Sequence, residues 1–152
     1  MSGVFIHRRT VRFGDCDPAG IVYYPRFFDI FHESMEQWFW VALDYRYDRV
    51  ILDDKVGFPT VHCAADFKIP AIMGEDLAIE VRVPKIGRSS IHFDYQVRTF
   101  GDPSAPLRLR GETVSVVMDL DPARPTFRRP LEIPADLRAR IEAFRGGPRV
   151  GA

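Results

Sequence analysis

The stretch that decides the fold is RFGDCDPAGIVYYPRFFDIFHESMEQWFWVA, residues 12–42. Its first part, GDCDPAG at 14–20, contains two glycines, two aspartates and a proline, and these turn-forming residues predict an ordered loop. Pro25 suits the first position of a helix, because its missing N–H would have no partner there and its φ is preset. We therefore predict a helix from Pro25 to about Ala42.

The predicted helix is apolar over most of its surface. Its hydrophobic side chains do not form a single stripe; they are Phe27, Phe28, Ile30, Phe31, Met35, Trp38, Phe39, Trp40, Val41 and Ala42. A helix that is hydrophobic all round is normally covered on all sides. We therefore expect the rest of the chain to envelop it.

Strand-like segments lie on both sides of this helix in the sequence. Residues 4–13 (VFIHRRTVRF) alternate and predict a strand that ends before the loop. After an irregular stretch at 44–56, the clearest alternation is LAIEVRV at 77–83. Further strands are predicted at 58–68, 89–100 and 107–120, without a second long helix among them. The expected order is β-α-β-β-β-β in one antiparallel sheet, which is an α+β fold.

The end of the chain predicts a short helix and a loose tail. Leu137, Ile141 and Phe144 recur at helical spacing after Pro134, and residues 146–152 are expected to be frayed. With 152 residues and 46% apolar side chains, the chain can build one core, so we expect a single domain over 1–152.

One economical packing exists for a long apolar helix followed by an antiparallel sheet. The sheet curves around the helix and buries it, which is the hotdog arrangement. A sheet this short leaves free edges and apolar surface, and such edges usually pair with another copy. We therefore expect a homodimer or a homotetramer.

Composition narrows the class of partner. The 21 basic and 21 acidic residues cancel to a formal net charge of +0, which disfavours nucleic acid and anionic membranes and favours a small-molecule ligand. No apolar run reaches the roughly 18 residues of a membrane span, and the first residues lack the apolar block of a signal peptide. A cytoplasmic protein is expected, in which Cys16 and Cys63 are free thiols.

The segment RFGDCDPAGIVYYPRFFD at 12–29 closely resembles the segment that defines the 4-hydroxybenzoyl-CoA thioesterase family. Weaker matches follow in GFPTVHCAADF at 57–67, DLAIEVRVPKIGRSSIHF at 76–93 and LEIPADL at 131–137. The resemblance implies a hotdog fold and hydrolysis of an acyl-CoA thioester. It also implies that Asp17 attacks the thioester or activates water, and that the backbone N–H of Tyr24 polarises the thioester carbonyl.

The residues support this chemistry independently. Asp17 stands just ahead of a helix start, where backbone N–H groups around Tyr23, Tyr24 and Arg26 lack intrahelical partners and the helix dipole favours an oxyanion. Gly20 would let the backbone approach the thioester closely. Asp15 and Asp17 could instead both serve only to stabilise the turn. With the resemblance, Asp15 keeps that structural role and Asp17 does not, although its nucleophilic and general-base roles stay open.

Coenzyme A requires cationic partners for its phosphates, and it enters here as part of the substrate, with no other cofactor expected. The resemblance places that site in PKIGRSS, at Lys85, Arg88, Ser89 and Ser90. The archetype of the 4-hydroxybenzoyl-CoA thioesterase family carries charged side chains at the positions of Gly87 and Ser89. The nucleotide could therefore instead use other cations of this chain, namely Arg110, Arg128 or Arg129. Solvated turn charges are the competing interpretation of the same residues.

The acyl group is expected to lie between subunits along the helix. Candidate lining residues are Tyr23, Phe28, His32, Phe58, Thr60 and His62. Aromatic residues at helical spacing are more often core than pocket. The archetype has an acidic residue near its hydroxylated ring where this chain has His32, so aromatic and medium-chain acyl groups both stay open.

A metal site and two other functions are alternatives to hydrolysis. DCDPAG begins like a calcium loop but has Ala19 and Arg26 where oxygen ligands are required, and the histidines lie on separate elements, so no metal is expected. A hotdog hydratase could use His32 with Glu36, one turn away. A non-catalytic acyl-CoA-binding protein would need the pocket but not Asp17. The carboxylate at Asp17 favours the thioesterase.

Overall fold

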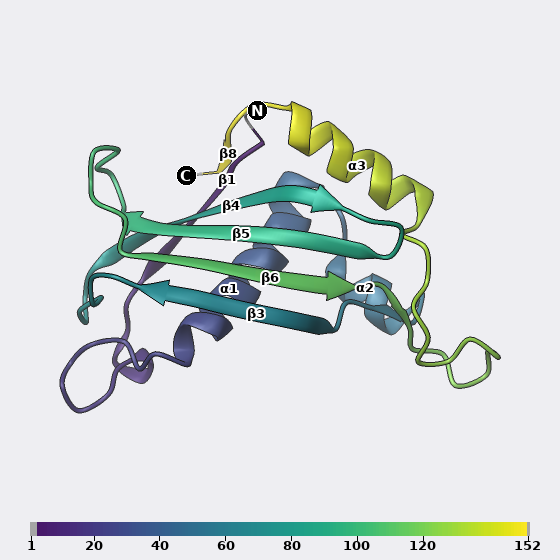
Figure 1. Ribbon diagram of the computed structural model, residues 1–152, viewed down its shortest axis with the longest axis horizontal. Helices are drawn as coiled ribbons and strands as arrows, with labels where there is room; N and C mark the ends of the chain where they lie inside the picture. The colour runs from purple at the N-terminus through teal and green to yellow at the C-terminus, as the bar shows by residue number, and fades with distance from the viewer. Residues whose placement is uncertain (1–2, 152) are drawn as a thin grey trace.

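A computed structural model describes residues 3–151. Its main sheet has six strands in the order β3-β6-β5-β4-β1-β8, and α1 crosses one face of that sheet (Figure 1). The sheet strands are β1 (Phe5–Thr10), β3 (Thr60–Phe67), β4 (Asp76–Ile86), β5 (Ser90–Thr99), β6 (Leu109–Val116) and β8 (Val150–Gly151). All pairings are antiparallel except that of β1 with β8. The predicted α+β fold with a mainly antiparallel sheet is confirmed.

The central helix has two parts. The α-helix α1 (Arg26–Gln37) continues directly into the π-helical turn η2 (Trp38–Ala42), where the Leu43 N–H donates to the Trp38 carbonyl at 3.2 Å. Pro25 has helical dihedral angles, but α1 begins one residue later than predicted, at Arg26, and Pro25 is its N-cap residue. The prediction of an enveloped helix is wrong for the single chain, because Trp40 and Val41 are 49% and 51% exposed. The sheet covers only one side of the helix.

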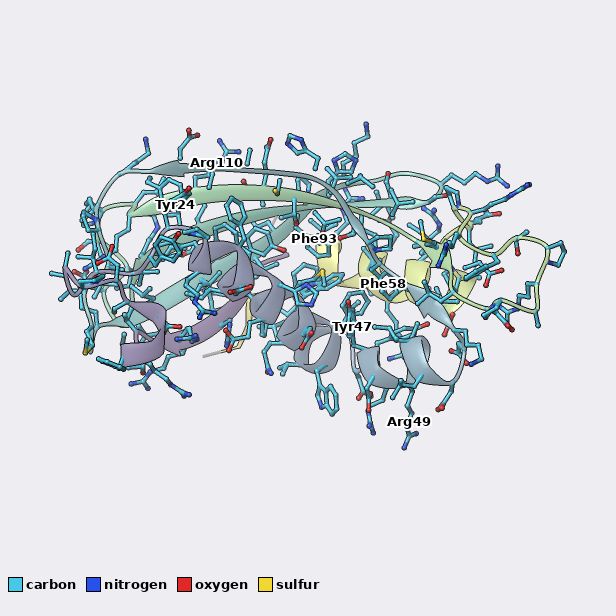
Figure 2. All side chains as sticks on the ribbon, turned by 90° about the horizontal axis from the view of Figure 1, so that it is seen from below. Tyr24, Tyr47, Arg49, Phe58, Phe93 and Arg110 are labelled. Atoms are coloured by element: carbon cyan, nitrogen blue, oxygen red, sulfur yellow. The ribbon has the colours of Figure 1, made fainter. Side chains whose placement is uncertain are left out.

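The core lies between α1 and the sheet. Phe31 stacks on Tyr95 with ring centroids 4.5 Å apart. Gly111 makes this contact possible, because a Cβ there would lie 2.3 Å from Cε2 of Phe31. Figure 2 shows Phe93 on the helical side of the sheet and Arg110 on the opposite side. Alternate residues of each strand therefore separate an apolar inner face from a charged outer face.

The remaining elements are short, and two of them correct predictions. The stretch predicted to be irregular at 44–56 contains α2 (Tyr47–Leu52), whose Val50 is buried against the core. The tail predicted to be frayed is paired, since β8 lies beside β1 and the Val150 N–H donates to the Val4 carbonyl at 2.9 Å. The two residues of β8 are too few to show a strand pattern in the sequence, so their pairing with β1 could not be predicted. Ala152, at the end of the predicted tail, and residues 1–2 of the predicted domain lie outside the described residues.

Two strand predictions were too long. The segment predicted at 4–13 ends at Thr10, after which a 3₁₀ turn, η1 (Phe13–Asp15), begins and leaves Phe13 83% exposed. The segment predicted at 107–120 is divided into β6 and β7 (Met118–Asp119), and β7 pairs with β2 (Val56–Gly57) outside the main sheet. The predicted closing helix is present as α3 (Ala135–Gly146), with Leu137, Ile141 and Phe144 buried.

Candidate active site

The loop that carries Asp17 closes on itself before α1 begins. The Asp17 N–H donates to the Ile21 carbonyl at 2.9 Å, and the Tyr23 N–H donates to the Asp15 carbonyl at 2.9 Å. The Val22 N–H donates to the Ala71 carbonyl at 2.9 Å, which ties the loop to the segment before β4. Because each end of the loop is bonded to the other, the position of Asp17 is coupled to that of Tyr23 and of the helix start.

Asp15 is the structural aspartate of this loop. Its side chain is largely buried and accepts a forked pair of bonds from Arg9, at 2.6 and 3.0 Å, and a third bond from the Arg12 N–H at 2.8 Å. The Arg9 guanidinium holds the pKa of the Asp15 carboxyl below its usual range. All of this bonding serves to hold the loop, as expected for Asp15.

The Asp17 carboxylate accepts fewer hydrogen bonds than that of Asp15. Its Oδ1 accepts the Ala19 N–H at 2.8 Å, which is an ordinary Asx turn. Within residues 3–151, no Lys, Arg or His forms an ion pair with it, and Oδ2 accepts no hydrogen bond. One oxygen is therefore held while the other is free to act on a ligand.

Tyr24 supplies the one open donor at the start of α1. The N–H groups of Tyr23 and Arg26 are both used, the latter donating to the Tyr23 carbonyl at 2.8 Å, and Pro25 has no N–H. In the described part of the chain, the Tyr24 N–H donates to no acceptor. Of the three N–H groups that the sequence predicted to lack partners, only that of Tyr24 has none among the described residues. It lies at the positive end of the helix dipole.

A cavity of about 230 Å³ lies farther along α1, between the helix and β3. Its lining residues are Phe28, His32, Met35, Thr60, Cys63, Tyr95 and Thr113. The Tyr95 hydroxyl lies 3.2 Å from Oγ1 of Thr113, and burial raises the pKa of Tyr95, which keeps its hydroxyl neutral. The cavity is thus largely apolar and has a few hydroxyl groups in its wall, which is typical of small-molecule sites.

The predicted coenzyme A residues lie at the other end of the sheet. Lys85, near the end of β4, and Arg88, in the turn that follows, are both exposed, and this turn joins β4 to β5 beside α3 (Figure 1). Arg138 of α3 donates to the Gly87 carbonyl at 2.7 Å, so the turn is anchored. Strand register places this turn level with Thr60, whereas the ring of Tyr24 contacts Phe67 at the opposite end of β3. One chain by itself does not bring the turn to Asp17.

Comparison with known proteins identifies the fold family. The sequence model of the thioesterase-like superfamily matches residues 11–141, which include both Asp17 and the predicted coenzyme A turn. The chain belongs to the thioesterase-like superfamily.

Individual relatives agree with this assignment. A 1,4-dihydroxy-2-naphthoyl-CoA hydrolase of Nostoc punctiforme is 36% identical over 93 residues, or 61% of this chain and 62% of that protein. The structure of a 1,4-dihydroxy-2-naphthoyl-CoA thioesterase from Synechocystis superposes with a TM-score of 0.79 at 26% identity, over 91% of this chain and 95% of that one. The structure of the 4-hydroxybenzoyl-CoA thioesterase of Pseudomonas sp. strain CBS-3 superposes with a TM-score of 0.75 at 26% identity, over 90% of this chain and 98% of that one. The resemblance drawn from the sequence, and the hotdog fold it implied, are therefore supported.

Three predicted pocket residues of this thioesterase-like chain lie outside the cavity. Phe58 is buried in the core, where it stacks on Tyr47 at 5.6 Å (Figure 2). His62 lies on the outer face of β3, with Nε2 3.0 Å from Oε1 of Glu112. A β-bulge between Thr60 and His62 explains the difference, because the extra residue turns Thr60 inward and His62 outward. Tyr23 is exposed beside Tyr24 and does not line the cavity.

The sequence also missed several residues of the site. Cys63, Tyr95 and Thr113 line the cavity from three different strands, and only the strand register brings them together. Tyr47 contacts His32 with ring centroids 6.2 Å apart, and burial raises its pKa to about 12. The short helix that carries Tyr47 lacks a long apolar pattern, so no sequence signal marked it.

The described residues also bear on metals and membranes. Among residues 3–151, no three His, Cys, Asp or Glu side chains are grouped so that they could hold a metal ion. No helix in that range is long and apolar enough to cross a membrane. Cys16 and Cys63 are free thiols.

Proposed function

We propose that this protein hydrolyses the thioester of an acyl-CoA to a free acid and coenzyme A. The observation that carries the proposal is the unpaired Tyr24 N–H at a helix start, in a closed loop that also holds an unneutralised Asp17. The relatives named as CoA hydrolases support it, although the matched part spans only 62% of the Nostoc protein. Thioester hydrolysis needs such a carboxylate together with a donor for the developing oxyanion.

Two chemical routes use the same groups. In one, Asp17 takes a proton from water as the water oxygen adds to the carbonyl carbon, the tetrahedral intermediate expels the coenzyme A thiolate, and the Asp17 carboxyl passes the proton to that thiolate. In the other, Asp17 itself adds to the carbonyl carbon and expels the thiolate, and water then cleaves the anhydride. In both routes the negative charge on the carbonyl oxygen develops next to the Tyr24 N–H, and the helix dipole stabilises it.

The acyl site that we propose is the cavity along α1. Phe28 and His32 follow Tyr24 at intervals of four residues, so one helix face leads from the donor into the cavity. A cavity of ~150 Å³ is known to hold benzene. The cavity here is about 230 Å³, which gives room for a larger ring system, and its aromatic wall suits an aromatic acyl group. The hydroxyls of Thr60 and Thr113 could bind ring hydroxyl groups.

A second copy of the chain completes the site in this proposal. Among residues 3–151, β3 is paired only with β6, and no strand in that range pairs with its other edge. Several exposed apolar side chains lie on β3, in the segment between β3 and β4, or just before α1; they are Val61, Phe67, Ile69, Ile72, Met73, Tyr23 and Tyr24. Exposed apolar side chains on and near an unpaired strand are characteristic of an interface. We therefore propose pairing of two β3 edges in a homodimer, which could further assemble into a homotetramer.

Such a dimer also accounts for the distant coenzyme A turn. A two-fold axis at the β3 edge reverses the direction of the second copy. Its β4–β5 turn, with Lys85 and Arg88, then lies at the end of the joint sheet where the first copy has Asp17. The phosphates would thus be held by one copy while the thioester lies at the loop of the other, with no further cofactor. The free thiols are consistent with the reducing cytoplasm in which we place the protein.

One contact favours a second candidate function. Nε2 of His32 lies 3.0 Å from Oε1 of Glu36, the pair that a hotdog hydratase could use to add water to an enoyl-CoA. A hydratase would not need the carboxylate at Asp17. We therefore rank it below the thioesterase, and keep a non-catalytic acyl-CoA-binding protein as the third possibility.

A panel of acyl-CoAs tests the proposal. Benzoyl-, hydroxybenzoyl-, dihydroxynaphthoyl- and medium-chain acyl-CoAs are supplied to the protein, and release of the free thiol is followed with a thiol reagent. We expect turnover with at least one aromatic thioester. Tight binding without thiol release would favour the binding protein, and loss of enoyl absorbance with crotonyl-CoA would favour the hydratase. Arg88→Ala should raise KM and leave kcat unchanged if Arg88 contributes only to binding coenzyme A.

A further inference from the structure

Arg9 is the most extensively bonded cation near the active-site loop, and it touches none of the proposed reacting groups. It lies on β1, and its guanidinium is largely buried. It donates to Asp15 through Nη1 and Nη2, to the Thr10 carbonyl at 2.6 Å, and to Oε2 of Glu33 through Nε at 3.1 Å. Glu33 lies on α1, so one side chain joins the strand, the loop and the helix.

The loop end of this connection is coupled to the two catalytic groups. Asp15 stands two residues before Asp17, and its carbonyl accepts the N–H of Tyr23, the residue before Tyr24. The helix end acts on the other side of the site, because α1 begins immediately after Tyr24 and Pro25. The separation between the Asp17 carboxylate and the Tyr24 N–H therefore depends on how the loop is held against the helix.

We propose that Arg9 is a positioning residue, which sets the Asp17 carboxylate against the Tyr24 N–H by binding Asp15 on the loop and Glu33 on α1. The planar guanidinium suits this role, since Nη1 and Nη2 together hold one carboxylate with two parallel hydrogen bonds while Nε remains available for a second carboxylate. A lysine would keep the charge but could not form this paired arrangement of hydrogen bonds. The inference rests on the proposed thioesterase function and names a residue that this function does not by itself require.

The expected kinetic effect follows from the geometry. Misplacement of a catalytic group by ~1 Å can cost up to about a hundred-fold in rate. Arg9→Met should lower kcat by about ten-fold to a hundred-fold and leave KM within about two-fold, because Arg9 does not touch the acyl cavity or the coenzyme A turn. Arg9→Lys should recover only part of kcat.

The pH profile separates positioning from a general loss of structure. In Arg9→Met the Asp15 carboxylate loses its fork and keeps only the Arg12 N–H and the more distant charge of Arg26. An uncompensated negative charge two residues from Asp17 opposes ionisation of that carboxylate. The acidic limb of kcat/KM should move to higher pH in Arg9→Met. It should return toward the wild-type position in the double variant Arg9→Met/Asp15→Asn.

Two further variants keep the test decisive. Arg8→Met is the matched control, because Arg8 is the neighbouring residue on β1 and pairs with Asp76 on the outer face at 2.6 Å. It should leave kcat unchanged. Glu33→Gln removes the charge from the helix contact alone and so weakens it; with its side chain 47% exposed, this variant should fold even if Arg9→Met does not. It should lower kcat several-fold without changing KM.

The possible outcomes separate this inference from the proposed function. Wild-type turnover together with an unchanged kcat in Arg9→Met or in a folded Glu33→Gln variant overturns the positioning role alone. Full recovery of kcat in Arg9→Lys also overturns it, since a positive charge without the forked pair of hydrogen bonds would then suffice. If the wild-type protein hydrolyses no thioester in the panel, the proposed function fails and the positioning role fails with it.

Discussion

Two loops of this protein contain nearly the same five residues, DCDPA at 15–19 and DLDPA at 119–123. In each, the first aspartate is buried and the second accepts the alanine N–H through Oδ1, at 2.8 Å for Asp17 and 2.9 Å for Asp121. The turn closes in the same way, because the carbonyl of the second aspartate accepts the N–H of the sixth residue at 3.0 and 3.1 Å. The two copies therefore have the same local geometry.

The sixth residue makes the difference. In the second loop it is Arg124, which pairs with Asp119 at 3.3 Å and with Asp121 at 3.4 Å and so neutralises the second carboxylate. In the first loop it is Gly20, which has no side chain and leaves Asp17 without a basic partner among the described residues. A buried aspartate and an Asx turn are therefore structural features of both loops. The functional difference lies in the groups that remain open.

The largest expected difference between the loops is catalytic. Asp17→Asn should retain the Asx turn, since the amide oxygen can still accept the Ala19 N–H, but should lower kcat by ~10²-fold or more through loss of the carboxylate. Asp121→Asn is the matched control and should leave kcat unchanged. Thiol release by the two variants under saturating acyl-CoA measures the contrast. Equal activity of the two variants would show that Asp17 is only a turn residue.

The next effect concerns stability, and both buried aspartates should show it. Asp15→Asn breaks the charged pair with Arg9, and loss of hydrogen bonds to a charged group costs about 1.5–3 kcal/mol. For a chain of this size the melting temperature should fall by about 3–12 °C. Asp119→Asn should also lower it, because Asp119 accepts bonds from Thr126, Arg124 and the Asp121 N–H. Only Asp15→Asn should also reduce activity.

The pH dependence of this stability has a definite sign. Arg9 lowers the pKa of Asp15 in the folded protein, so the folded state binds a proton less readily than the unfolded chain does. The stabilisation is present at neutral pH and is lost as the pH falls through the lowered pKa. The difference in unfolding free energy between wild type and Asp15→Asn should therefore shrink below about pH 4 in urea titrations. A constant difference from pH 7 to pH 3 would contradict the assigned cause.

The smallest effect tests the sixth residue itself. Gly20 has φ of 78°, where a side chain is strained, yet a Cβ there would meet no atom within 4 Å. Gly20→Ala should cost about 1 kcal/mol from strain alone. Arg124→Ala, at the corresponding place in the other loop, removes half-exposed ion pairs and should cost less than about 1 kcal/mol. A rise in KM confined to Gly20→Ala would show that the backbone at Gly20 approaches the thioester.

Much of the site could be predicted because its signals are local. Turn residues at 14–20, followed by Pro25 and an apolar run, specify a loop and a helix start by short-range sterics and hydrogen bonding. These two elements contain both Asp17 and Tyr24. Period-two alternation likewise located the main strands, because successive side chains of a strand point to opposite faces.

The missed features depend on contacts between distant segments. The bulge before His62 exists only in the pairing of β3 with β6, and one extra residue reverses the face of the side chain. The C-terminal tail is ordered because β8 pairs with β1. The role of Arg9 could not be predicted from the sequence either, because its partners Asp15 and Glu33 come from other elements and contact it only in the folded chain.

The sequence by itself determined the loop, the helix start and the residue types available for chemistry, since these follow from dihedral preferences and short-range hydrogen bonds. Only the tertiary structure decided which of them stay open. Arg124 and Gly20 can be read from the sequence, but only the folded chain shows that Arg124 pairs with Asp119 and Asp121, while the Asp17 carboxylate has no basic partner and the Tyr24 N–H no acceptor within residues 3–151. It also placed the coenzyme A turn at the far end of the sheet, because strand register, and not distance along the chain, sets which residues lie side by side.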